Sequence, residues 1–279
     1  CSGRSDHLIF AVMTIRDFFL FSILMATLSS GVVNSCTHKP AAIHEEQHRA
    51  DSLINAAYAV HDYDSILTLA DELESKGNIS EMEADYWRGY AYNRMRKMRL
   101  AENEWKKAVG LGINDDDDLV FYAKSANRLA GLLVLRFNYE EALLRSMSSM
   151  KILEERDFTR NTDYVNLITF VGTCQLRLGY PDDANESYQE AYRRYLQILH
   201  DDDDIANYTS SIIGLVSITD AYIQTDHYKE AYDWTERFDY LLRGYREHGQ
   251  ANEDFIDKQW ARLNFYRSSA LEGMGRSEE

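Results

Sequence analysis

Small and large apolar residues recur at fixed steps along this chain of 279 residues. Counted in residues from Gly89, positions 0, 3, 12, 16 and 19 are Gly89, Tyr92, Ala101, Trp105 and Ala108. They recur without a gap at Gly172, Gln175, Ala184, Tyr188 and Ala191. Steps of three and four place residues on one helix face, and small residues allow two antiparallel helices to approach closely. The pattern therefore predicts helix pairs in which a large aromatic ring of the second helix fills the hole between neighbouring pairs.

Weaker copies of this pattern lie before, between and after the two strong ones. The first small or apolar position of each second helix is occupied by Ile66, Ala101, Ala142, Ala184 and Ala231. These anchor positions stand 35, 41, 42 and 47 residues apart. The spacing between anchors grows along the chain, so either helices lengthen or loops carry insertions. Residues 270–279 have the pattern of a first helix and its turn, which begins a sixth pair.

These positions resemble those of the tetratricopeptide repeat (TPR), whose standard length is about 34 residues. The resemblance covers residues 45–279, or about five and a half repeats, and implies an all-α, irregular solenoid of antiparallel helix pairs. Arg88 departs from the family where leucine is usual, and Ser146 and Thr235 depart where an aromatic ring is usual. A solenoid end needs a polar cap, so we expect the array to be truncated at Glu279.

The N-terminal residues predict export. Residues 1–12 precede the first plausible start, Met13, and we expect them to be a non-native or upstream extension. Residues 13–35 have a short basic start and an apolar stretch that is too short for a membrane span of about 20 residues. They are therefore interpreted as a signal peptide. The expected location is the bacterial envelope, either in the periplasm or anchored to a membrane.

The end of this segment, Val33-Asn34-Ser35-Cys36, resembles a bacterial lipoprotein box. The resemblance implies that Cys36 is lipidated and that residues 36–44 link it to the array. The buried acyl chains would tether the protein to the membrane. Ordinary cleavage nearby and a retained signal anchor are the alternatives.

Composition limits the possible partners. The chain has 46 acidic and 30 basic residues, for a formal net charge of −16. This charge repels the phosphates of nucleic acids and disfavours docking on anionic lipid through basic patches. The chain has only two prolines, which favours long helices. The three cysteines form no CxxC pair, and we expect Cys174 to be a small core residue.

Three acidic or histidine-containing segments have the composition of metal ligands. His44-Glu45-Glu46-Gln47-His48 matches the H-E-x-x-H zinc-protease helix, but its neighbours are polar and no third ligand stands out. We interpret it as a solvated linker. The aspartate runs 115–118 and 201–204 lack the ligand spacing of an EF-hand loop. Each stands where one pair ends and the next begins, so helix capping is expected, with a weak divalent-cation site as the alternative.

No phosphate-binding loop, dinucleotide fingerprint or nucleophile elbow is present in the sequence. We therefore expect no cofactor, no metal and no catalysis on this chain. A binding groove is expected instead on the first helices of the pairs. Its predicted residues are Tyr86, Tyr90, Asn93 and Arg94 in one pair, Asn166, Thr169, Thr173 and Arg177 in the next, and Asp220 and Gln224 in a third.

Polar and aromatic groups at these groove positions suit the capture of a protein or peptide partner, or of a small ligand. Arg94 and Arg177 could hold a carboxylate. A solvated groove wall that binds nothing is the alternative interpretation.

A signal segment followed by a long-spaced array resembles the periplasmic sensor region of bacterial two-component histidine kinases. The resemblance implies that partner binding is signalled across the membrane and that the kinase lies outside this chain. The membrane would then be reached through the lipid anchor or through a downstream transmembrane helix. A free-standing lipoprotein scaffold for envelope proteins is the first alternative, and a SusD-like glycan-binding lipoprotein is the second.

Overall fold

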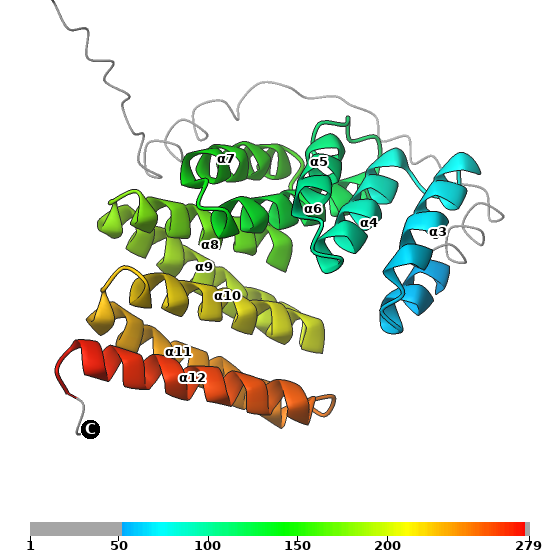
Figure 1. Cartoon of the computed structure of the whole chain (residues 1–279). Helices are drawn as coiled ribbons and strands as arrows, with labels where there is room; N and C mark the ends of the chain where they lie inside the picture. The colour runs from blue at the N-terminus through cyan, green and yellow to red at the C-terminus, as the bar shows by residue number, and fades with distance from the viewer. Residues whose placement is uncertain (1–51, 277–279) are drawn as a thin grey trace, which may run out of the picture. The chain divides into compact units, whose positions relative to one another are not determined.

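The computed structural model describes residues 52–276, which belong to the unit formed by residues 40–279. Their regular secondary structure is helical throughout (Figure 1). After a helix over residues 52–59, the helices are α3 (Tyr63–Ser75), α4 (Glu81–Arg94), α5 (Met98–Ala108), α6 (Asp116–Leu135), α7 (Tyr139–Glu155), α8 (Thr162–Arg177), α9 (Pro181–Asp201), α10 (Ile205–Ile223), α11 (Tyr228–Glu247) and α12 (Glu253–Gly273). The predicted signal segment, Cys36 and the His44–His48 motif lie outside the described residues.

The helices form the predicted antiparallel pairs. Each helix from α3 to α11 contacts the next helix along the chain. The first helices also contact one another across pairs, α4 with α6, α6 with α8, α8 with α10 and α10 with α12. These helices therefore form one face, which we name the inner face. Figure 1 shows α8 to α12 side by side in chain order, as the predicted all-α array requires.

The five anchor positions of the second helices have no exposed surface, as the repeat pattern predicted. The glycines of the first helices have the role expected of them. A Cβ atom on Gly89 would overlap the Trp105 ring, and one on Gly172 would lie 2.7 Å from the Tyr188 ring. Because both rings belong to the second helix of the same pair, any larger residue at the two glycines would force the helices apart.

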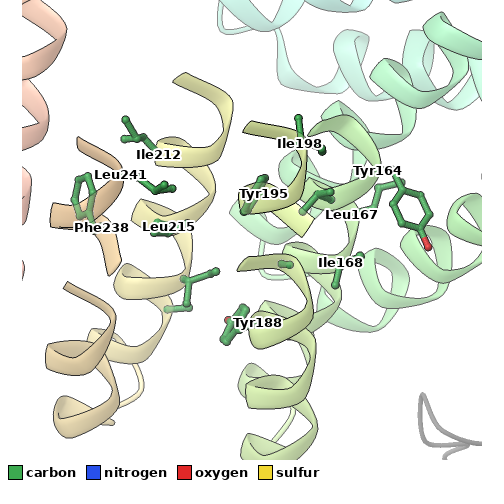
Figure 2. Packing of buried hydrophobic residues seen from close by; sticks show 14 of the residues in the cluster. Tyr164, Leu167, Ile168, Tyr188, Tyr195, Ile198, Ile212, Leu215, Phe238 and Leu241 are labelled. Atoms are coloured by element: carbon green, nitrogen blue, oxygen red, sulfur yellow. The ribbon is translucent and has the colours of Figure 1, made fainter. Parts of the chain in front are cut away.

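The aromatic rings of the second helices fill the spaces between pairs. Tyr188 of α9 meets Tyr222 of α10 and Trp234 of α11, with ring centroids 5.3 and 6.0 Å apart. Tyr195 lies further along the same face of α9 and is fully buried against Gly214 of α10. Figure 2 shows Tyr188 and Tyr195 among the aliphatic side chains of the same core. Each such ring contact contributes about 0.5–1.5 kcal/mol beyond its buried area.

The turns within pairs share one backbone conformation. A residue with positive φ stands two positions before each second helix, at His61, Arg96, Phe137, Gly179 and Asp226. Its N–H donates to the carbonyl three residues back, and the next N–H donates to the carbonyl five residues back, as in Arg96 to Asn93 and Lys97 to Tyr92. This closure satisfies the last carbonyls of the first helix and favours glycine at the left-handed position.

The aspartate runs cap helices, as predicted. Asp115 accepts a hydrogen bond from the Asp118 N–H at the start of α6, and Asp204 accepts one from the Ala206 N–H at the start of α10. Residues 52–276 contain no group of three or more potential metal ligands. No helix in that range is long and apolar enough to cross a membrane. Cys174 is buried as expected, and burial raises its pKa to about 12.

Candidate functional site on the inner face

A pocket of about 440 Å³ lies on the inner face and is lined mainly by residues of α6, α8 and α10, with Asn93 of α4, Trp105 of α5 and Tyr139 of α7. Its wall is partly polar and partly apolar, which suits a peptide or small organic ligand. Five predicted groove residues line it, namely Asn93, Thr173, Arg177, Asp220 and Gln224. We name this site the inner-face pocket. The structure thus brings together groove residues from three helix pairs, which the sequence had predicted one pair at a time.

The other five predicted groove residues do not line the pocket. Tyr86, Tyr90 and Thr169 are buried between helices and offer little surface. Arg94 is exposed but is bound to Tyr63, donating to its hydroxyl at 3.2 Å. Asn166 accepts from the Tyr195 hydroxyl and donates to the Ser210 hydroxyl.

Arg177 is the central polar side chain of the pocket. Its guanidinium donates to the side-chain oxygen of Gln224 and, at 3.4 Å, to the Gln224 carbonyl. The same group lies over the Tyr139 ring, 5.8 Å from its centroid. The Nε atom is buried and has no hydrogen-bond partner among residues 52–276. Arg177 is therefore held by neutral groups and retains a buried donor.

A chain of hydrogen bonds leads from Arg177 toward the C-terminal helix. Gln224 donates to one oxygen of Asp220, and the Tyr266 hydroxyl of α12 lies 3.4 Å from the other. Burial raises the pKa of Asp220 above its usual value. The chain of hydrogen bonds links α8, α10 and α12, which are three of the first helices.

Sequence reasoning missed the contribution of α6. Asn127, Arg128 and Gly131 line the pocket, and Asn127 donates to Asp163 of α8 at 2.6 Å. A Cβ atom on Gly131 would lie 3.0 Å from the Phe170 ring, so α6 and α8 are in close contact beneath the pocket. The signal was present in the sequence, because the helical spacing of Leu129, Ala130 and Leu133 assigns these apolar residues to the buried face of this helix. The positions on its opposite face follow from that assignment.

The antiparallel pairs and their shared inner face define an α-solenoid of the TPR-like class. Among solved structures, the chain is similar to BtubC (BKLC) from P. vanneervenii, with a TM-score of 0.51 and 15% identity over 85% of this chain and 86% of that one. It is also similar to the apo form of RapI, with a TM-score of 0.52 and 12% identity over 85% of this chain and 99% of that one. At these identities the likeness shows the fold alone.

No protein-family model matches the chain, and the comparison with curated proteins found no match. The geometry of the chain's own residues therefore carries the functional argument.

Proposed function

We propose that the chain is a non-catalytic protein-binding scaffold that takes a peptide segment of its partner in the inner-face pocket. The observation that carries this proposal is the inner-face pocket itself, which is lined by Arg177, a cation whose buried Nε has no hydrogen-bond partner among residues 52–276. A buried donor without an acceptor costs free energy, and an oxygen of a bound segment toward which the guanidinium turns would remove that cost. Phe170 and Leu135 offer apolar surface beside it.

The proposal extends to the extracytoplasmic sensor region of a bacterial histidine kinase. The signal-like N-terminal sequence supports export, and the hydrogen bonds from Arg177 through Gln224 and Asp220 to Tyr266 support an output. An occupant that binds Arg177 competes with Gln224 and so shifts the balance between two arrangements of these helices. A free-standing lipoprotein scaffold would use the same pocket without that output.

Selection from a random displayed peptide library tests the pocket. The obstructing variant is Ser217→Trp, because Ser217 lines the pocket and its hydroxyl bonds only to its own helix, at the Ile213 carbonyl. The matched control is Leu144→Trp on α7, whose side chain is 68% exposed away from the pocket. Peptides selected on the wild type should bind Ser217→Trp at least about tenfold more weakly and should bind Leu144→Trp unchanged.

Circular dichroism establishes that both variants are folded. If the selected peptides bind Ser217→Trp as tightly as the wild type, the inner-face pocket is not the binding site. If the selection enriches no peptide at all, the proposal of a peptide-binding scaffold is wrong.

A further inference from the structure

Two neighbouring turns form a surface that combines exposed apolar side chains with positive charge. The α4–α5 turn and the start of α5 carry Arg96, Lys97, Met98 and Arg99, and the end of α6 and the α6–α7 turn carry Leu135 and Phe137. All six side chains are exposed, and Leu135 and Phe137 are each 74% exposed. We name these six residues the turn surface.

The two turns lie next to each other. Arg136, between Leu135 and Phe137, forms an ion pair with Glu102 in the first turns of α5. Asn93 at the end of α4 and Phe137 also line the same pocket. The turn surface therefore continues the inner-face pocket over the edge of the array.

Phe137 is the residue of this surface that the fold explains least. Its φ is 59°, in the left-handed region that Arg96 of the same surface also adopts, whereas glycine occupies the equivalent position of the α8–α9 turn at Gly179. A side chain at this φ is disfavoured, because its Cβ crowds the backbone. The ring contacts Tyr139 edge-on at 6.2 Å but adds nothing to the buried core. The fold alone would favour glycine at this position.

The charges of the turn surface lack opposite charges nearby. Within residues 52–276, Arg96 and Arg99 form no ion pair, and Lys97 lies over the Tyr92 ring. Two carboxylates of the neighbouring helices are already engaged, Glu102 with Arg136 and Lys106, and Glu141 with Lys106 and Arg145. The surface therefore presents net positive charge to a partner.

We propose that the turn surface docks an acidic segment of a partner protein, with a bulky apolar side chain of that segment packed against Phe137 and Leu135. The inference rests on the proposed function, because the segment is the continuation of the one in the inner-face pocket. Charge complementarity favours a protein segment over a bilayer. A segment contacts only the cationic patch, whereas an anionic bilayer also meets the field of a chain whose net charge is −16.

The test uses the peptides selected on the wild-type protein. They should be enriched in aspartate, glutamate and aromatic residues. The variant Arg96→Glu/Lys97→Glu/Arg99→Glu should bind them at least about tenfold more weakly at low salt, and added salt should weaken wild-type binding. The matched control is Lys151→Glu/Arg156→Glu/Lys258→Glu, which makes the same charge change at exposed residues of α7, its C-terminal end and α12. It should bind as the wild type does.

A second variant, Phe137→Gly, separates binding from folding. It should raise the melting temperature, because glycine suits the left-handed backbone, and it should weaken peptide binding. A role in folding alone would predict a higher melting temperature with unchanged binding, and that result would overturn the assignment of Phe137.

Failure of this inference can be told apart from failure of the proposed function. Peptides that depend on the pocket but are not acidic, or that ignore the triple glutamate variant, overturn only the turn surface. Two further results would also overturn it, because they identify another occupant. One is binding to vesicles of phosphatidylcholine and phosphatidylserine that the triple variant abolishes. The other is sedimentation of the wild type as an oligomer that the triple variant dissolves.

Discussion

Replacement of Asp85 by asparagine is expected to stabilise the protein at neutral pH. Asp85 is 2% exposed. One carboxylate oxygen accepts a hydrogen bond from Arg88 at 2.9 Å, and the other is buried with no partner among residues 52–276. Burial, reinforced by the Glu104 carboxylate, raises the pKa of Asp85 from 3.8 to about 6. The charged form is thus disfavoured in the folded chain.

The sign of the pH dependence follows from that shift. Because the folded pKa lies above the unfolded value, the ionised carboxyl lowers stability at every pH above about 6. The loss disappears as the pH falls from about 6 to about 4. One pKa unit corresponds to about 1.4 kcal/mol, so a shift from 3.8 to about 6 corresponds to at most about 3 kcal/mol. Asparagine keeps the shape without ionising, so we expect a gain of about 1–3 kcal/mol at about pH 7.5.

Urea denaturation at about pH 7.5, about pH 5 and about pH 4 measures this effect. The free energy of unfolding of the wild type should approach that of Asp85→Asn as the pH falls, with about half of the difference left at about pH 5 and little of it at about pH 4. The control is Asp71→Asn, because Asp71 binds the same Arg88 at 2.8 Å but its side chain is 68% exposed. That change should cost less than about 1 kcal/mol. A variant Asp85→Asn that is less stable than the wild type at about pH 7.5 would show that the Arg88 contact outweighs the burial of charge.

Three further predictions concern packing, reactivity and anchoring. Gly89→Ala should lower the free energy of unfolding by about 1–3 kcal/mol, because the new Cβ overlaps the Trp105 ring. The control Gly112→Ala should not lower it, because a Cβ there meets open space. Equal losses of the two variants in urea denaturation would contradict the packing argument. Cys174 should resist alkylation in the native protein, since it is buried and its pKa is raised to about 12, and labelling at the rate of the urea-unfolded protein would show otherwise. Cys36→Ala should abolish incorporation of labelled fatty acid in a bacterial host, and label retained in that variant would refute the lipoprotein box.

The helix pairs could be predicted because their contacts are local. Gly89 and Trp105 stand 16 residues apart, and so do Gly172 and Tyr188. In each case the glycine leaves room for the ring of the second helix. A close contact at a fixed separation leaves a repeating sequence pattern. The anchors Ala142 and Ala231 could then be found from the same register, although Ser146 and Thr235 replace the aromatic ring in those pairs.

The candidate site could be predicted only in part, because helical periodicity gives the face of a residue and not its depth. Tyr90 and Tyr86 do stand on the first-helix face. However, Tyr90 packs on Tyr58 of the preceding pair and Tyr86 packs on Phe121 of the following pair, with centroids 5.3 and 5.5 Å apart. These contacts cross between pairs, where the sequence separation is not fixed. Burial of the two tyrosines therefore follows from how neighbouring pairs pack, which a single sequence does not show.

The widening anchor spacing is a property of the helices, and it predicts a gradient of stability along the array. The α4 and α5 helices have 14 and 11 residues, whereas α10 and α11 have 19 and 20. The turn within each pair remains short in both cases. Longer helices bury more apolar surface between pairs. The largest buried cluster accordingly draws most of its residues from α6 to α12, with Met82 from α4 and Ala108 from α5.

The N-terminal pair has only small apolar clusters, built around residues such as Ile54 and Ile66. Its junction with α4 also depends on ion pairs of Arg88 with Glu74 and with the exposed Asp71, and an ion pair with an exposed partner contributes little to stability. We therefore expect amide hydrogen exchange to be fastest in residues 52–75 and slowest in α8 to α11. If the amides of α8 to α11 exchanged before those of residues 52–75, helix length and the ion-paired junction would not determine local stability, and this reasoning would be wrong.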